Sequence, residues 1–373
     1  VDAKAAEMTM KKGWNQIEFD KEAFRDSIIA ALEKGETELS YTTLAKELSA
    51  PDFDAIHKEL EHDPVDAYYS DDGKFEVTDE IVGCKFDVSQ AEKLWNDADP
   101  GDEVKIPLDI VWPEVTGDEL RGRLYRDLLG TMTTKFPNSG ENRRSNLELA
   151  TSKIDGMIMY PGDEFSYNEV VGQRTEEAGF LPAPAYVDGD VKDELGGGAC
   201  QVSSTLYAAT LFSFLETVER ECHYFPVNYM QMGTDATVTI PEGGGRSIDF
   251  KFRNSRNYPI KLVGIFNNEE STLTFEIWGT LEDDDYMPVE FDSSYSWVYD
   301  FDKFIDPAYP DRDGYTIKLT HETYSFEDDV GLGYRTLTHR QVIDADGNIV
   351  VDEITNSKLS NGNYAMDTYY QHN

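Results

Sequence analysis

The chain has 373 residues, with 33 Lys and Arg against 73 Asp and Glu, and so a formal net charge of −40 at pH 7. Phosphate backbones and anionic lipid surfaces repel such a polyanion, which argues against nucleic acid or an anionic membrane as the main partner. Hydrophobic residues make up 39% of the chain and aromatic residues 12%, which excludes a wholly disordered chain, and the length predicts two or three domains.

The first 115 residues read as a tail followed by a small domain. Residues 1–20 are interpreted as a linker or tail, and residues 21–115 as an α+β domain. Apolar residues recur at helical spacing in three segments of this domain, which are 21–34, 52–60 and 87–97. Extended, β-rich patterns predict strands at 36–42 and 104–110 and a hairpin at 68–78.

Residues 116–285 form the predicted central domain. A helix is expected over 143–157, and a longer helix begins at the glycine run 196–198 and ends before Tyr224. Strands are predicted after it, at 236–240, 247–253, 260–266 and 272–279. We expect the long helix to pack on an antiparallel sheet made from residues 236–279.

The last predicted domain, residues 286–373, is β-rich. Strand-like segments lie at 315–319, 334–342 and 348–354, and a turn at 344–347 joins the last two. The aromatic, acidic stretch 283–313 has no clear period and receives no assignment. The predicted fold class is therefore α+β, in a multi-domain chain whose central unit lies between a smaller α+β domain and a β-rich domain.

Neither a membrane span nor a disulfide framework is predicted. The longest markedly apolar stretch, 207–215, has nine residues, whereas a spanning helix needs about 20. Three cysteines, Cys84, Cys200 and Cys222, are too few and too scattered for a disulfide framework, although a Cys200–Cys222 pair stays open. The chain begins with Val1 rather than Met, which we interpret as a processed or truncated product.

The most unusual local sequence is the glycine run 196–198 followed by Ala199, Cys200 and Gln201. Glycines permit positive φ and the close approach of a substrate. A cysteine at the N-terminus of the following helix has a lowered thiol pKa, because the unpaired N–H groups and the helix dipole favour an anion. The same N–H groups, around Gly198, Ala199 and Gln201, are expected to stabilise an oxyanion. The segment therefore predicts a nucleophile site.

A thiolate catalyst needs a base, and His223 is the candidate. It lies 23 residues after Cys200, beyond the far end of the predicted long helix. A straight helix of about 20 residues spans about 30 Å, so a break or a returning strand is required to bring the two side chains together. Asp235 and Asp249 are the two candidates for orienting the imidazole.

Each candidate also has a simpler structural interpretation. A lone cysteine is most often a small buried hydrophobic residue, and Ser203 and Ser204, at a helix start, usually cap and pack. Arg174 and Arg220 either pair with the abundant acids or bind a substrate carboxylate. The two thiols and the histidine lack a Cys-x-x-Cys pair and a fourth ligand, so no metal is predicted.

Four motifs follow one another between residues 161 and 254. They are PGDEFSYNEVVGQRTEEAGF (161–180), GGGACQVSSTLY (196–207), ERECHYFPVNYMQMGTDATV (219–238) and DFKFRN (249–254). In this order they resemble the VanW domain of bacterial cell-envelope proteins. Residues 21–115 resemble the peptidoglycan-binding domain that often precedes VanW, and the tail with RTLTHRQVIDADGNIVVDE is similar to the small β domain that often follows it. The chain departs from the family pattern at Cys222 and at the glycine-rich link 241–245.

The resemblance implies peptidoglycan L,D-transpeptidation. In that reaction a cysteine attacks the carbonyl of the third residue of a stem peptide, and an amine from a neighbouring stem then takes over the acyl group. The family's cysteine, histidine and aspartate fall on Cys200, His223 and Asp235. The implied partners are peptidoglycan stem peptides, and no cofactor is expected. We expect a monomer that acts outside the cell, in the cell wall or on the outer face of the cytoplasmic membrane.

The residues assigned to substrate binding are Arg174, Ser203, Ser204, Arg220 and Asp249. Of these, Arg174 or Arg220 is expected to hold the terminal carboxylate of the stem. Two other functions stay open. A non-catalytic peptidoglycan-binding module would keep Cys200 buried and inert. A cysteine hydrolase, an L,D-carboxypeptidase, would use the same residues with water as the acyl acceptor.

Overall fold

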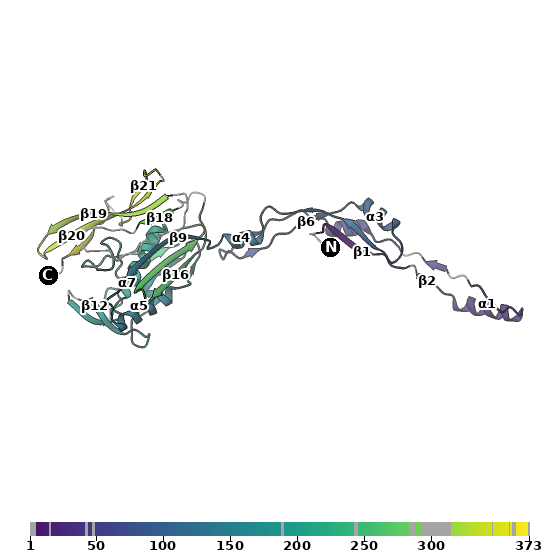
Figure 1. The fold of residues 1–373 in the computed structure, drawn as a ribbon, viewed down its shortest axis with the longest axis horizontal. Coiled ribbons are helices and arrows are strands. Elements are labelled where there is room, and N and C mark those ends of the chain that lie inside the picture. The colour runs from purple at the N-terminus through teal and green to yellow at the C-terminus, as the bar shows by residue number, and fades with distance from the viewer. Residues whose placement is uncertain are drawn as a thin grey trace. The chain divides into compact units, whose positions relative to one another are not determined.

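The computed structural model consists of two compact units (Figure 1). Unit 1 comprises residues 1–70 and 76–121, and unit 2 comprises residues 71–75 and 122–373. The residues that the structure describes are 5–14, 16–41, 44–46, 49–187, 190–241, 245–282, 288–292, 315–344, 346–357, 359 and 363–371. Helices and antiparallel strand pairs occur in both units, so the predicted α+β class is confirmed. The described helices include none with the length and apolar composition of a membrane span.

The three predicted helices of unit 1 begin where the sequence places them, whereas α4 (Gly117–Arg123) was not predicted. Asp20, Asp52 and Asp87 each precede a helix, and each side chain accepts hydrogen bonds from N–H groups of the first turn. The elements up to residue 123 are β1 (Glu7–Lys11), β2 (Gln16–Glu18), α1 (Lys21–Glu33), β3 (Leu44–Lys46), α2 (Phe53–Leu60), β4 (Tyr68–Tyr69), β5 (Val77–Thr78), β6 (Gly83–Lys85), α3 (Val88–Asp97), β7 (Glu103–Pro107), β8 (Asp109–Val111) and α4 (Gly117–Arg123).

Two strand predictions for unit 1 have different outcomes. The hairpin is confirmed, since β4 and β5 pair antiparallel. The described part of the predicted strand 36–42 is not a strand. There the chain turns back on α1, because Gly35 has a φ of +70° and the Glu36 N–H donates to the Ala31 carbonyl.

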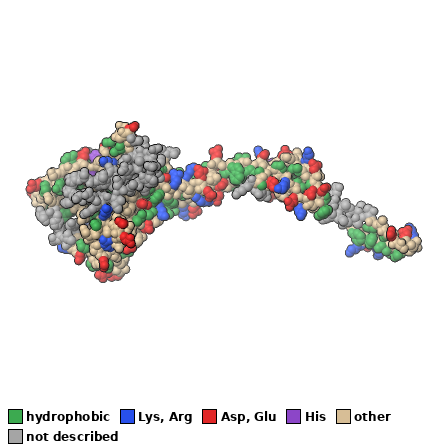
Figure 2. Space-filling model, in the orientation of Figure 1, with side chains coloured by type: hydrophobic (Ala, Val, Ile, Leu, Met, Phe, Trp, Pro, Cys, Tyr) green, Lys and Arg blue, Asp and Glu red, His purple; other side chains and the backbone are tan. Residues whose placement is uncertain are grey.

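A small core holds unit 1 together. Side chains of α2 and α3, with Phe53 and Trp95 at the centre, pack on β7 through Val104 and Ile106. On the face of unit 1 seen in Figure 2, acidic, basic and hydrophobic side chains are intermixed.

The main sheet of unit 2 has four strands in the order β10-β16-β17-β9. They are β9 (Asp127–Lys135), β10 (Ile158–Met159), β16 (Ile260–Asn267) and β17 (Thr272–Gly279). The predicted hairpin of the last two strands is confirmed. Strand β9 escapes prediction because it is buried almost throughout and therefore does not alternate. The helices α5 (Glu141–Ile154) and α7 (Ala199–Phe212) pack on this sheet, α7 against β9 and β17 (Figure 1).

The predicted extent of the sheet, 236–279, is partly wrong. Residues 236–240 form only an isolated bridge, between Thr239 and Ile248, because the Ala236 backbone bonds to serine side chains of α7 instead of to a strand. Residues 251–253 belong to a second sheet, of three strands in the order β11-β15-β14. Its strands are β11 (Glu164–Ser166), β14 (Glu216–Glu219) and β15 (Lys251–Arg253).

Helix α7 is shorter than predicted. It has 14 residues, about 21 Å of helix, and ends at Phe212 rather than shortly before Tyr224. The chain reverses at Phe214, whose φ is +57°, and Ser213 donates its hydroxyl to the Ala209 carbonyl. The helix therefore breaks well before His223, which is one of the two arrangements that bring His223 to Cys200, although strand β14 (Glu216–Glu219) does not itself carry His223.

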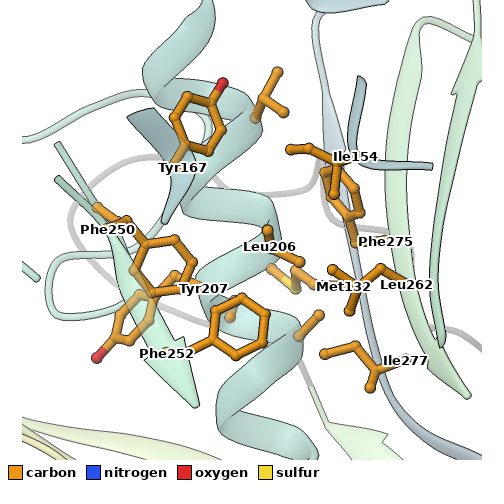
Figure 3. Packing of buried hydrophobic residues seen from close by; sticks show 14 of the residues in the cluster. Met132, Ile154, Tyr167, Leu206, Tyr207, Phe250, Phe252, Leu262, Phe275 and Ile277 are labelled. Atoms are coloured by element: carbon orange, nitrogen blue, oxygen red, sulfur yellow. The ribbon is translucent and has the colours of Figure 1, made fainter. Parts of the chain in front are cut away.

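The core of unit 2 surrounds α7 on two sides (Figure 3). Figure 3 shows Phe250 and Phe252 on one side of the helix, near Tyr207. On the other side, side chains of the main sheet face Leu206. Because the helix is enclosed in this way, its position relative to the sheet is fixed, and with it the position of its first turn.

The last strands of the chain also belong to unit 2. β18 (Pro288–Asp292), β19 (Tyr315–Glu327), β20 (Leu332–Ile343), β21 (Ile349–Ile354) and β22 (Asp367–Tyr370) form a five-stranded sheet. The turn between β20 and β21 is confirmed, since the Gly347 N–H donates to the Asp344 carbonyl. Of the unassigned stretch 283–313, only 288–292 lies within the described residues. A separate hairpin is formed by β12 (Pro182–Val187) and β13 (Asp190–Leu195). A short helix, α6 (Tyr167–Val171), follows β11.

We predict that Gly130→Ala destabilises unit 2. Gly130 lies in β9 under the end of α7, where a Cβ atom would collide with Ser213 and with the Ala209 carbonyl. Such overpacking typically costs about 1–3 kcal/mol of the free energy of unfolding. Thermal unfolding followed by circular dichroism measures the effect. Gly122→Ala is the matched control, because a Cβ there meets no atom within 4 Å. Equal unfolding temperatures for the two variants would contradict this packing.

Candidate active site

The glycine run 196–198 forms the turn that starts α7. Gly196 and Gly198 have left-handed φ angles of +77° and +115°. A side chain at Gly196 would collide with Arg174, one at Gly198 would press on Arg143, and one at Gly197 would collide with the backbone of β12. The run is therefore needed both for its backbone conformation and for the close approach of two arginine side chains.

Cys200 lies in the first turn of α7 and is the only residue of this helix that is not buried. Its Sγ atom is 3.5 Å from the backbone N and O atoms of Val238, and it forms a hydrogen bond with His223. Burial alone raises the pKa of the thiol. The hydrogen bond and charge of His223, the Val238 N–H and the charge of Arg174 outweigh burial and lower this pKa below its ordinary value.

His223 and Asp235 are joined by two hydrogen bonds. The imidazole Nδ1 is 2.6 Å from Oδ2 of Asp235, and the His223 backbone N–H donates to the same oxygen at 2.7 Å. Burial lowers the pKa of His223, but Asp235 and Cys200 raise it to about 10. Burial likewise raises the pKa of Asp235, whereas His223 and Arg220 lower it to about 2. Thiol, imidazole and carboxylate are therefore poised as a thiolate–imidazolium–carboxylate chain.

Other side chains bind the Asp235 carboxylate at the oxygen that does not contact His223. Arg220 donates its Nε–H to the Asp235 carbonyl at 2.6 Å, and its Nη2 is 3.3 Å from Oδ1. Tyr369, in β22, donates its hydroxyl to Oδ1 at 2.5 Å and accepts the Gly233 N–H. The other end of Arg220 is paired with Asp367. The sequence gives no local signal for Asp367 or Tyr369, because Tyr369 follows Asp235 by 134 positions.

The serines of α7 hold the Asp235 segment against the helix. Ser203 donates its hydroxyl to the Ala236 carbonyl at 2.6 Å, and Ser204 accepts the Ala236 N–H at 3.0 Å. Ser204 also donates its hydroxyl to the Cys200 carbonyl at 2.6 Å, the Ser203 Oγ atom lies 3.1 Å from the same carbonyl oxygen, and both side chains are fully buried. Ser203 and Ser204 therefore position the backbone beside Cys200.

Tyr229 is a further site residue that sequence reasoning missed. Its hydroxyl is 3.5 Å from the His223 Nε2 atom. Burial, followed by the charge of Cys200, raises the pKa of Tyr229 well above its ordinary value, so the phenol stays protonated. The only signal in the sequence is its place six residues after His223, which brings it near the imidazole if the chain turns there.

The remaining assigned residues have other partners. Asp249 accepts hydrogen bonds from the Ser166 hydroxyl and from the backbone N–H groups of Asn168 and Phe250, so it holds the turn before α6 and not the imidazole. Arg220 lies behind Asp235, as described above. Arg174 lies with its guanidinium 5.3 Å from the ring centre of Tyr167, and its charge acts on Cys200.

Two of the three amides assigned to an oxyanion site are occupied within the turn. The Ala199 N–H donates to the Gly196 carbonyl, and the Gln201 N–H donates to the Gly198 carbonyl. The Gln201 side chain lies between β9 and Arg143, accepting a hydrogen bond from the arginine Nη2 at 3.0 Å. Gly198, at the N-terminal cap of α7, keeps its amide next to Cys200.

Cys222 differs from Cys200 although it precedes His223 directly. Its Sγ donates to the Thr368 carbonyl at 3.7 Å. Burial, with the charges of Asp367 and Asp235, raises the pKa of this thiol to about 12. All three cysteines are free, so Cys200 and Cys222 are not paired. Within the part of the chain that the structure describes, no three His, Cys, Asp or Glu side chains are placed to hold a metal ion.

We predict that Asp235→Asn slows alkylation of Cys200 at pH 6. Without the carboxylate the pKa of His223 falls and that of Cys200 rises. Each unit by which the Cys200 pKa rises lowers the thiolate fraction of Cys200 at pH 6 by about tenfold. Iodoacetamide labelling followed by peptide mass spectrometry gives the rates. Cys84, whose thiol pKa is raised by burial, is the internal reference. In the unchanged protein Cys200 should be labelled before Cys84, and the substitution should reduce the ratio at least about tenfold. An unchanged ratio would contradict the ion chain.

Comparison with known proteins finds relatives of the region that contains this site. Residues 142–278 match the family model described as VanW like protein. The chain is 38% identical over 160 residues to the uncharacterized protein YoaR of Bacillus subtilis (strain 168). This alignment covers 43% of this chain and 51% of that protein. The chain is 28% identical over 147 residues to the vancomycin B-type resistance protein VanW of Enterococcus faecalis (strain ATCC 700802 / V583). This alignment covers 39% of this chain and 47% of that protein.

The chain thus spans about half the length of these curated relatives. No solved structure matches it significantly. The matched region contains Cys200, His223 and Asp235, whereas Asp367 and Tyr369 lie outside it. Residues 142–278 are therefore similar to the VanW-like family.

Proposed function

We propose that this protein is a peptidoglycan L,D-transpeptidase with Cys200 as its nucleophile. The observation that carries the proposal is the Cys200–His223–Asp235 chain at the start of α7. A thiol whose pKa is lowered, next to an imidazole that a buried carboxylate orients, is the arrangement that thiol-dependent acyl transfer requires. A curated relative whose name refers to vancomycin resistance supports a role in the cell wall.

Acylation begins from the thiolate–imidazolium pair. The Cys200 thiolate attacks the carbonyl carbon of the third stem residue, and the carbonyl oxygen becomes an oxyanion bound by the amides of Gly198 and Cys200. The oxyanion then collapses and the C–N bond to the terminal D-Ala breaks. His223 gives its proton to the departing amine, which leaves a thioester on Cys200 and a neutral imidazole.

Deacylation restores the starting state. The side-chain amine of a neighbouring stem attacks the thioester carbonyl, and neutral His223 takes the proton that the amine loses. The C–S bond breaks, which returns the Cys200 thiolate and forms an amide between two third residues. Asp235 keeps the imidazole oriented and stabilises its charged form in both steps.

The proposal extends to the setting of the reaction. Its substrates are stem peptides of the cell wall, so the protein acts outside the cytoplasmic membrane, in the wall or on the outer face of that membrane. The chain supplies the nucleophile, the base and the orienting carboxylate from one copy of unit 2, so a monomer suffices. A hydrolase that uses the same residues with water as acceptor is the second candidate, since the ion chain serves both acceptors.

We expect the protein to convert a disaccharide-tetrapeptide into a dimer linked through third residues, with loss of D-Ala. Muropeptide mass spectrometry identifies the products, and intact-mass spectrometry detects the thioester. Cys200→Ala should abolish product and adduct. Cys84→Ala, which changes a thiol of unit 1, should keep both.

The other outcomes separate the alternatives. Loss of D-Ala without a dimer would make the protein a carboxypeptidase. Retained binding to peptidoglycan with neither adduct nor product would contradict the enzyme and favour a binding module.

A further inference from the structure

Two arginines beside Cys200 have buried nitrogen atoms without a hydrogen-bond partner. Nη1 and Nη2 of Arg174 and Nη1 of Arg143 are inaccessible to solvent, and no described residue accepts a hydrogen bond from them. Buried guanidinium donors are nearly always satisfied, because desolvating a cation without a partner is costly. These atoms therefore need an explanation that the folded chain alone does not supply.

Both guanidinium groups are nevertheless held in place. The stem of Arg174 lies on Gly196, and its guanidinium lies over the ring of Tyr167. The other guanidinium, that of Arg143, donates Nη2–H to Gln201 at 3.0 Å. Because these contacts fix the groups without using the unpartnered nitrogens, the donors are oriented in advance for a ligand.

Arg143 and Arg174 lack a carboxylate partner in a chain that is rich in acidic residues. The chain has 73 acidic residues, and buried Arg220 pairs with both Asp235 and Asp367. Among the described residues, no acid forms an ion pair with Arg143 or Arg174, which leaves two positive charges at the nucleophile in a strongly acidic protein.

The geometry points to a carboxylate-binding site formed by Arg143 and Arg174, which takes the free terminal carboxylate of the donor peptide. This assignment rests on the proposed function and names the specificity-determining residues of the same site. Guanidinium groups bind carboxylates through paired, charge-assisted hydrogen bonds. Both arginines pack on the glycine turn that leads to Cys200. An anion bound there must therefore lie only a short distance along the peptide chain after the attacked carbonyl. A carboxylate one residue beyond the scissile bond meets this condition, since its carbon lies within about 4 Å of the attacked carbon.

The test is peptide binding to the Cys200→Ala protein, which forms no thioester, so affinity is measured without turnover. The probes are a stem tetrapeptide with a free terminal carboxylate and the same peptide with a terminal amide. Isothermal titration calorimetry gives the dissociation constants. We expect the amide to bind at least about tenfold more weakly than the acid.

Substitutions locate the contact. In the Cys200→Ala background, Arg174→Gln and Arg143→Gln should each weaken binding of the acid at least about tenfold and leave binding of the amide nearly unchanged. Arg144→Gln is the matched control, because the Arg144 side chain bonds to Ser139, Asn268 and Ser271 and should leave both affinities unchanged.

Melting temperatures separate a binding role from a structural one. The buried nitrogens of Arg174 have no hydrogen-bond partner within the fold, so Arg174→Gln should not lower the melting temperature. A lower melting temperature with unchanged peptide affinity, equal binding of acid and amide, or no binding of the acid would overturn the site. Selective binding of the acid by a protein that shows no turnover would instead uphold the carboxylate site and contradict the transpeptidase.

Discussion

The carboxylate of Asp235 has no solvent exposure, and much of unit 2 is arranged to keep it charged. A buried carboxylate persists only if it is paired and hydrogen-bonded, because desolvation strongly disfavours its charge. His223 and Arg220, from one segment, and Tyr369, from another, supply those partners. The turn at the end of α7 brings His223 and Arg220 to Asp235, and the pairing of β22 with β20 brings Tyr369 there. The C-terminal sheet is therefore part of the site and not an appendage to it.

The two oxygens of the Asp235 carboxylate have different partners. Arg220 and Tyr369 bind one oxygen of Asp235, and the other oxygen faces His223. The imidazole is thus charged and oriented so that it can hydrogen-bond to Cys200, whose thiol pKa falls in consequence. The charge gathered around Cys200 contrasts with the −40 charge of the whole chain. A cationic centre suits a substrate whose reacting end is an anion.

Local sequence was sufficient to single out Cys200 at the start of α7 and to predict most helices and hairpins. The glycine run before Cys200 is a signal within six residues, and aspartate caps mark the helices of unit 1. The end of α7 could not be predicted, because Phe214 takes a positive φ with neither glycine nor proline at the turn. Tyr369 and Arg143 could not be predicted either. Their roles depend on the pairing of distant strands and on the packing of α5 against α7, and neither leaves a local pattern.

The protonation state of His223 tests the central claim most directly. Nuclear magnetic resonance of protein labelled with ¹⁵N at histidine gives the charge of this imidazole across the pH range, with His223→Gln to assign its signals. The structure predicts a doubly protonated ring at pH 8 that loses its proton only near its pKa of about 10, and earlier in Cys200→Ser, where the thiolate is gone. A ring that is neutral at pH 8 in the unchanged protein would contradict the ion chain and the mechanism built on it.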